Sequence, residues 1–177
     1  IAKSGKALYI GLSNYDSDTL KKASAILKDL KCPYVVNQNR YSIFDRSIDN
    51  NGVKKATAQE GKGLIVYSPL EQGLLSGKYL DGMIPADSRM ASDSPFLTED
   101  SLTADMLTRL NKLNEVAALR GQSLSQLAIS WALRDETVAS VVIGASKPEQ
   151  IIDNVRAINQ INLNPRDLTL IDQLAGV

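Results

Sequence analysis

Histidine is absent from the 177-residue sequence. A histidine-based catalytic triad, a histidine general acid and most zinc sites are therefore excluded within this chain. Cysteine occurs once, as Cys32, which excludes an intrachain disulfide and a cluster of thiolate metal ligands. We accordingly expect no metal site, and the cysteine usage favours a reducing, cytoplasmic location.

Long apolar runs and an excess of one charge are lacking as well. No run of about 18 apolar residues occurs, so we expect neither a transmembrane helix nor contact with a membrane. Lys and Arg number 20, as do Asp and Glu, which gives a formal net charge of zero. This balance argues against a nucleic-acid partner, and any bound anion must be held by individually placed groups. No secretory signal pattern is visible, and because the chain begins at Ile1 we expect its natural start to lie upstream.

Four short apolar runs have the character of buried strands. Each is continuous rather than alternating, as expected for strands covered on both faces of a parallel sheet. Each ends in small or polar residues. The runs are ALYIGLSN (7–14), CPYVVNQN (32–39), GLIVYSPL (63–70) and ASVVIGAS (139–146).

Helical patterns lie between and after these runs. Ser17 is the expected N-cap of the first helix, and Trp131 is expected in the core. Strand–helix alternation predicts an α/β fold with a parallel sheet, either a small open doubly wound sheet or half of an eightfold barrel. Both folds bind ligands at the carboxyl ends of their strands. The predicted helices span 17–30, 47–60, 103–119, 123–134 and 147–158, and the last begins at Pro165.

One connection is much longer than the others. Residues 71–100 are rich in Gly, Ser, Asp and Pro and have no apolar periodicity. A loop of this length directly after a strand is typical of a lid, a binding loop or disorder, and we favour the lid.

The segment VVIGASKPEQIIDN (141–154) has two compatible interpretations. Ser146 and Glu149 fit a capping box, in which the serine caps the helix and the glutamate reaches back. The same helix terminus could instead bind a phosphate, because Gln150, Asp153 and Asn154 share one helix face with it. A capped helix still offers unpaired N–H groups, so the two readings do not exclude each other.

Several motifs resemble those of the aldo-keto reductase family. They are SGKALYIGLSNY, NQNRYSIFDR, YSPLEQGLLSGKY, IPADSRM and VVIGASKPEQIIDN, and they occur in family order and spacing over essentially the whole chain. The resemblance is closest to bacterial reductases of glyceraldehyde 3-phosphate and methylglyoxal, a branch related to the β subunits of voltage-gated potassium channels. It implies a (β/α)₈ TIM barrel that binds NADPH.

The resemblance implies that residues 1–177 are the C-terminal half of such a barrel, with its fifth to eighth strands. The family's catalytic Asp, Tyr, Lys and His are then expected upstream, in a missing N-terminal half, and none is assigned to this chain. The complete protein would reduce a small carbonyl substrate, an aldehyde or ketone, whereas this chain alone would be inactive. Alternatives are a non-catalytic NADP(H)-binding regulatory module and an open α/β domain that binds another phosphate ligand. A homo-oligomer is possible, and unpaired outer strands would invite pairing with another half.

The resemblance also implies cofactor contacts at the first three strand ends. Ser13 and Asn14 would bind the nicotinamide carboxamide with Gln38, although the first two could simply form a turn. Tyr67 would stack on the nicotinamide ring, although a lone tyrosine at a strand end is more often core. Two further residues, Arg40 and Tyr41, could edge the substrate pocket, and we reject Tyr41 as the catalytic acid because no Lys or His partner can be named.

The phosphates are expected further along the chain. After Ser68 and Pro69, free backbone N–H groups from Leu70 to Gly73 suit a pyrophosphate. Lys78 and Arg89 would point to the cofactor phosphates, although either alone could be a solvated surface charge. The adenosine 2′-phosphate and adenine would contact Gly144, Ser146, Lys147, Gln150, Asp153 and Asn154.

Overall fold

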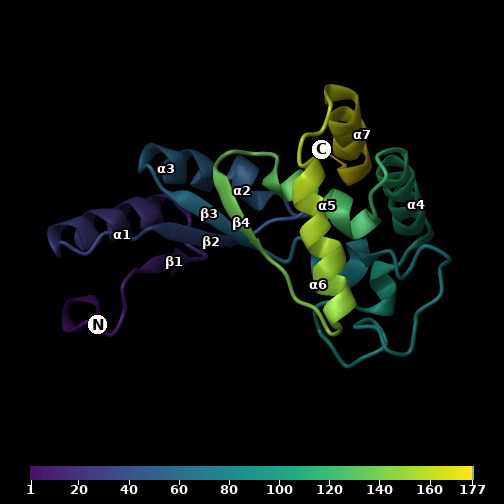
Figure 1. Ribbon diagram of the computed structural model, residues 1–177, viewed down its shortest axis with the longest axis horizontal. Coiled ribbons are helices and arrows are strands. Elements are labelled where there is room, and N and C mark those ends of the chain that lie inside the picture. Colours follow the sequence, from purple (N-terminus) through teal and green to yellow (C-terminus); the bar gives the residue numbers. More distant parts are fainter. Residues whose placement is uncertain (177) are drawn as a thin grey trace.

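A parallel four-stranded sheet organises the computed structural model, which describes residues 1–176 (Figure 1). The strands are β1 (Gly11–Ser13), β2 (Val36–Arg40), β3 (Gly63–Tyr67) and β4 (Val138–Val142). Each pairs in parallel with the next strand of the sequence, in the order β1-β2-β3-β4. The predicted parallel sheet is therefore confirmed, and all four carboxyl ends lie along one edge of it.

Helices follow the strands as the apolar spacing predicts. The α-helices are α1 (Ser17–Asp29), α2 (Ser47–Asn50), α3 (Val53–Gln59), α4 (Ala104–Leu119), α5 (Leu124–Leu133), α6 (Pro148–Val155) and α7 (Pro165–Ala175). Short 3₁₀ segments are η1 (Ala2–Ser4), η2 (Glu71–Ser76), η3 (Glu99–Ser101) and η4 (Arg156–Gln160). No helix within residues 1–176 combines the length and apolar character needed to cross a membrane.

The strand order distinguishes between the two folds that the sequence leaves open. A doubly wound sheet reverses its strand order at a switch point. Here the order follows the chain without a reversal, as in consecutive units of a (β/α)₈ barrel. The two central strands alternate between buried and half-buried residues, whereas β1 and β4 are largely exposed because each has one strand neighbour.

Several predicted boundaries are wrong. The helix expected over 47–60 is split into α2 and α3 by Gly52, whose φ of 80° lies in the left-handed region and breaks the helix. Asp16, not Ser17, caps α1: its Oδ1 accepts bonds from the N–H groups of Asp18 and Thr19, both at 2.9 Å. The last strand ends at Val142, so 143–146 lie outside the sheet.

The core is centred on α5, which is buried on almost every side. Trp131 is fully buried, as predicted, and its ring centroid lies 4.8 Å from that of Tyr41. The guanidinium carbons of Arg134 and Arg46 lie 3.8 and 4.5 Å from the indole centroid. One aromatic ring and two cations thus enclose the indole.

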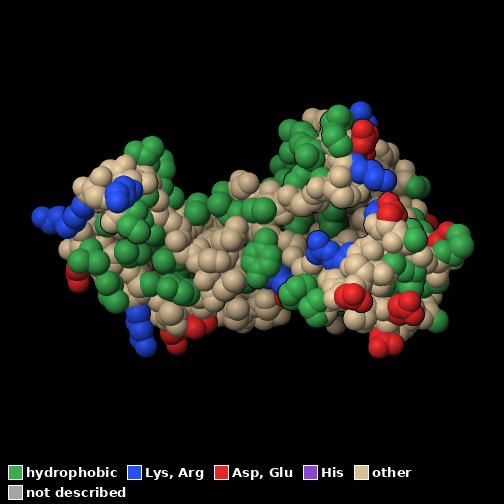
Figure 2. All heavy atoms as spheres, turned by 90° about the horizontal axis from the view of Figure 1, so that it is seen from below, with side chains coloured by type: hydrophobic (Ala, Val, Ile, Leu, Met, Phe, Trp, Pro, Cys, Tyr) green, Lys and Arg blue, Asp and Glu red, His purple; other side chains and the backbone are tan. Residues whose placement is uncertain are grey.

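Both outer edges of the sheet leave apolar side chains exposed. Leu8 and Tyr9 precede β1, and Ile152, Val155 and Ile158 project from α6 and η4 beyond β4. Figure 2 shows apolar side chains on the surface of the narrow end of the molecule, which carries α1 and β1. The apolar burial that stabilises the centre is therefore incomplete at the two edge strands.

Candidate functional site

A cavity of about 1020 Å³ opens at the carboxyl ends of β3 and β4, and we call it the strand-end cavity. The turn after β3, the long loop, the end of β4 and the N-terminus of α6 enclose it. Its lining includes these predicted cofactor residues: Tyr67, Ser68, Pro69, Leu70, Gly73, Lys78, Arg89, Gly144, Ser146, Gln150, Asp153 and Asn154. Of the other predicted residues, Ser13, Asn14, Gln38 and Lys147 lie outside the lining.

The turn after β3 has an unusual backbone. Ser68, Glu71 and Gln72 have φ values of 56°, 47° and 59°, and Gly73 has a φ of 105°. Such left-handed conformations are unfavourable for residues other than glycine and concentrate at ligand sites. The prediction of free N–H groups from Leu70 to Gly73 is wrong in part, because Glu71 N–H donates to Ser68 O and Gly73 N–H to Leu70 O.

Residues at the first three strand ends contact one another beside this cavity through one side-chain bond and one backbone bond. The Tyr67 hydroxyl donates to Asn14 Oδ1 at 3.1 Å, and the Asn14 N–H donates to the Gln38 carbonyl at 2.8 Å. Ser13 is the register partner of Gln38. Asn14 has a φ of 58°, so the turn that the sequence suggests is present as well. The structure therefore brings the predicted carboxamide residues to the predicted stacking tyrosine.

The long loop closes one side of the cavity through three polar contacts. Arg89 donates to Gln72 Oε1, and Gln72 Nε2 donates to Ser68 Oγ at 2.9 Å. Lys147 Nζ lies 3.4 Å from Asp87 Oδ2, an ion pair that joins the loop to the start of α6. The hydrogen bond from Lys147 and the charge of Lys78 lower the pKa of Asp87 below its usual value. Cations and a carboxylate thus share the cavity rim.

The start of α6 is capped differently from the predicted S-x-x-E box. Gln150, not Glu149, reaches back: its Oε1 accepts from the N–H groups of Ser146 and Lys147 at 2.8 and 3.1 Å. The Ser146 hydroxyl also donates to it, at 3.2 Å. The helix begins one residue later than the box requires, at Pro148, which moves the reciprocal position to Gln150.

The polar face of α6 is partly used inside the protein. Asp153 Oδ1 accepts from Gln126 Nε2 at 2.7 Å, and Oδ2 accepts from the Ser123 hydroxyl at 2.9 Å. Asn154 is buried. Asp153 therefore ties α6 to the N-terminus of α5, a role that its spacing with Gln150 does not reveal.

Of the two candidates for the substrate rim, Tyr41 does not lie as predicted. Tyr41 is fully buried, and its hydroxyl contacts the Asp49 carboxylate at 3.1 Å, so it edges no pocket. Burial raises the pKa of this hydroxyl, which agrees with its rejection as a catalytic acid. Arg40 pairs with the carboxylates of Glu71 and Asp45.

Two of the lining residues that sequence reasoning does not single out connect separate segments of the site. Gln72 bonds both the turn and the loop, and Asp87 faces Lys147. Both stand in motifs that carry the family resemblance, YSPLEQGLLSGKY and IPADSRM. Their partners lie far along the chain, so spacing alone could not assign them a contact.

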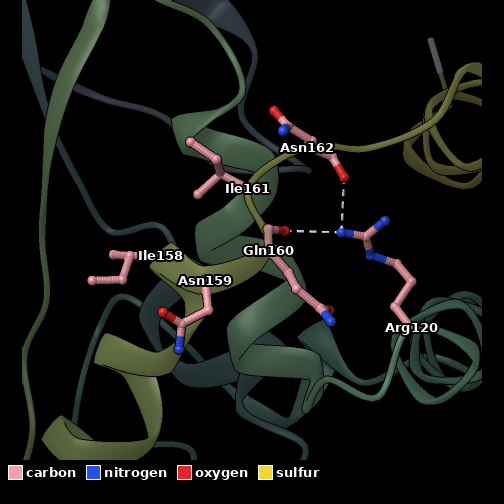
Figure 3. A pocket seen from close by; sticks show the side chains of 6 residues that line it. All are labelled: Arg120, Ile158, Asn159, Gln160, Ile161 and Asn162. Atoms are coloured by element: carbon pink, nitrogen blue, oxygen red, sulfur yellow. Dashed lines mark hydrogen bonds between the residues drawn. The ribbon is translucent and has the colours of Figure 1, made fainter.

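A second, smaller pocket of about 440 Å³ lies beside η4 (Figure 3). Arg120 Nη2 reaches the carbonyl oxygens of Gln160 and Asn162 at 2.9 and 3.2 Å. Its other nitrogens bond Gln122 and Asp167. Because its guanidinium is fully engaged within the protein, Arg120 fastens the end of α4 to the segment before α7 and offers no anion site.

Consecutive parallel β/α units with a cavity at the strand ends define a protein of the (β/α)-barrel class. A family model described as "Aldo/keto reductase family" matches residues 1–175, and the chain belongs to that family. Its fold is accordingly the α/β fold of the TIM barrel, of which it covers about half.

Two kinds of curated relative are similar to the chain. An L-glyceraldehyde 3-phosphate reductase of Escherichia coli K12 is 43% identical over 174 residues, which are 97% of this chain and 50% of the relative. A probable voltage-gated potassium channel subunit beta of Oryza sativa subsp. japonica is 38% identical over 162 residues, 90% of this chain and 49% of the relative. A probable subunit of the same kind from Arabidopsis thaliana is 36% identical, covering 96% of the chain and 53% of the relative. The chain thus spans about half the length of these relatives.

Proposed function

We propose that this chain is the NADPH-binding half of an oxidoreductase that reduces small aldehydes or ketones in the cytoplasm. One observation carries the proposal: Lys78, Arg89 and the N-terminus of α6 converge on a cavity that also reaches Tyr67. A cavity of about 1020 Å³ suits an elongated ligand, and its cations and helix terminus suit phosphates. The reductase relative supports the reaction type.

The donor set fits the two ends of a dinucleotide. Arg89, Lys78 and Lys147 would neutralise the phosphates, with Lys147 at the 2′-phosphate. At the other end, Asn14 and Gln38 offer both donors and acceptors to a carboxamide, and Tyr67 would hold one face of the nicotinamide. The cofactor supplies the hydride, and these residues bind and orient it.

The proton donor is proposed to lie in an upstream half of the barrel. This sequence contains no histidine, and Tyr41 is enclosed in the core. The unpaired edges of β1 and β4 would receive that half, which would also complete the substrate pocket. The chain alone would therefore bind carbonyl substrate poorly and turn none over.

Titration of the full-length protein tests the cofactor. Nicotinamide fluorescence should report tight binding of NADPH and weaker binding of NADH, and a small aldehyde should then oxidise the bound NADPH. Equal affinity for the two nucleotides would refute the 2′-phosphate assignment. If neither nucleotide binds, the result would favour an α/β domain that binds another phosphate ligand.

A second candidate is a regulatory module that binds NADP(H) without turnover. The two channel-subunit relatives favour it. Binding of NADPH with no oxidation by any of a panel of small aldehydes and ketones would support this reading over the enzyme. The sequence upstream of Ile1 offers an independent check, since an Asp, Tyr, Lys and His at successive strand ends would favour the enzyme.

A further inference from the structure

The turn that borders the strand-end cavity is held by a partly buried carboxylate. Glu71 lies in this turn with a φ of 47°, and its side chain is 15% exposed. One carboxylate oxygen accepts from Arg40 Nη2, and the other accepts from the Ser42 hydroxyl at 2.5 Å. Two donors, one at the end of β2 and one just after it, therefore hold a residue of the turn after β3.

The donors themselves are fixed in place. Ser42 is fully buried, and its Oγ accepts from the N–H groups of Phe44 and Asp45 at 3.2 and 2.9 Å. Arg40 ends β2, and its Nε lies 3.2 Å from Asp45 Oδ2. Glu71 is thus bound to the end of β2 and to the residues that directly follow it.

The next residue connects the turn to the long loop. Gln72, also left-handed at a φ of 59°, donates to Ser68 Oγ and accepts from Arg89. Two consecutive left-handed residues are unfavourable without outside support. The carboxylate contacts of Glu71 supply that support. They hold the backbone of the turn in the conformation in which the Gln72 side chain reaches Arg89.

We propose that Glu71 is a positioning residue for the cofactor site: its contacts with Arg40 and Ser42 hold the turn so that Gln72 keeps Arg89 at the cavity. Glu71 does not line the cavity, so it acts through its neighbours. This proposal rests on the proposed function, which identifies the ligand as NADPH. It adds that affinity for the cofactor depends on a carboxylate anchored to β2.

The test measures NADPH affinity in the full-length protein and its Glu71→Ala, Glu71→Gln and Ser42→Ala variants. Loss of charge-assisted bonds that fix the turn should weaken NADPH binding about tenfold in Glu71→Ala. Glu71→Gln keeps one acceptor oxygen, so its NADPH affinity should lie between those of the unmodified protein and Glu71→Ala. Ser42→Ala removes one of the two bonds to Glu71, together with the bonds that Ser42 Oγ accepts from the N–H groups of Phe44 and Asp45, and it serves where Glu71→Ala fails to fold.

A double-mutant cycle separates positioning from general destabilisation. In an Arg89→Ala background, Glu71→Ala should change NADPH affinity less than twofold, because the group it positions is gone. Glu60→Gln is the matched control: it disturbs a carboxylate bonded to Ser24 Oγ at 2.7 Å, outside the cavity lining, and should leave NADPH affinity unchanged.

The outcomes separate the two proposals. If the unmodified protein does not bind NADPH, the proposed function fails, and with it the ligand assumed here. If it binds NADPH and Glu71→Ala binds equally well, the positioning role is refuted. Fully additive effects of Glu71→Ala and Arg89→Ala would also overturn it, because Glu71 would then not act through Arg89.

Discussion

Lys147 and Asp87 face each other across the cavity rim, and both side chains are 63% exposed. A contact so open to water adds little stability, so Lys147 is available to a phosphate. We expect Lys147→Ala to weaken NADPH binding by about 1–3 kcal/mol and NADH binding much less, as measured by fluorescence titration of the full-length protein. Lys28→Ala, at the exposed end of α1, is the control. Equal weakening of both nucleotides would show that Lys147 does not read the 2′-phosphate.

Asp135 and Lys54 form an ion pair that links α3 to the segment before β4. Burial alone would raise the pKa of Asp135, but hydrogen bonds from Lys54 and the Thr137 N–H lower it below its usual 3.8. A lowered native pKa means that this stabilisation is present above about pH 4 and is lost as the pH falls through the native value.

Asp135→Asn should therefore lower the free energy of unfolding by roughly 1–2 kcal/mol at pH 7. The difference from the unmodified protein should shrink as the pH falls from 7 towards 3, because the protonated form of Asp135 gains population. Urea unfolding at both pH values measures it. A penalty that is the same at pH 3 and pH 7 would contradict the assignment.

At the scale of elements, Asp153 joins α6 to α5 through Gln126 and Ser123. We expect Asp153→Ala to lower the free energy of unfolding by roughly 1–2 kcal/mol, because two hydrogen bonds to a charged group are lost at the start of a core helix. Urea unfolding of the full-length protein measures this, with Asp93→Ala in the exposed long loop as the control. A large loss of NADPH affinity at unchanged stability would instead restore Asp153 as a direct cofactor contact.

Local sequence patterns predict which elements form but not where they meet. The apolar runs and helical stripes identify the strands and the longer helices because burial of one face dominates their formation. Gly52 splits a predicted helix, and its Asn-Asn-Gly context is a turn signal that the weak apolar pattern obscures. The cap of α6 shifts by one residue, because helix ends depend on contacts as much as on residue type.

Half of the cavity-lining residues could be predicted, because family motifs mark the strand ends. The contact of Arg40 with Glu71 could not, since the two residues lie 31 positions apart and meet only when β2 and β3 pair. Tyr41 was misplaced for a related reason. A residue directly after a strand can direct its side chain to the pocket or to the core. The Tyr41 ring packs against Trp131 in a tilted arrangement and therefore lies in the core.

For the whole molecule, the two unpaired edge strands determine how the isolated chain should behave. Residues 1–177 alone should bind a hydrophobic dye and self-associate at micromolar concentration, because β1 and β4 present open edges beside exposed apolar side chains. The full-length protein should do neither. Dye fluorescence and light scattering after size-exclusion chromatography measure the two effects.

A charge placed at one edge provides the control for that experiment. Val142→Lys, on β4, should reduce self-association, whereas Leu119→Lys should not, although Leu119 at the end of α4 is also exposed. A monomeric isolated chain with little dye binding would mean that the edges are not interaction surfaces.

The enclosure of Trp131 makes the only indole of this chain an optical reporter of its centre. Its emission should stay that of a shielded ring while ligands enter or leave the strand-end cavity, whose lining does not include it. The emission should shift to the red when α5 separates from the helices and strands around it. In this chain, which contains no other tryptophan, that one signal would follow the opening of the core, while nicotinamide emission would independently follow the cofactor.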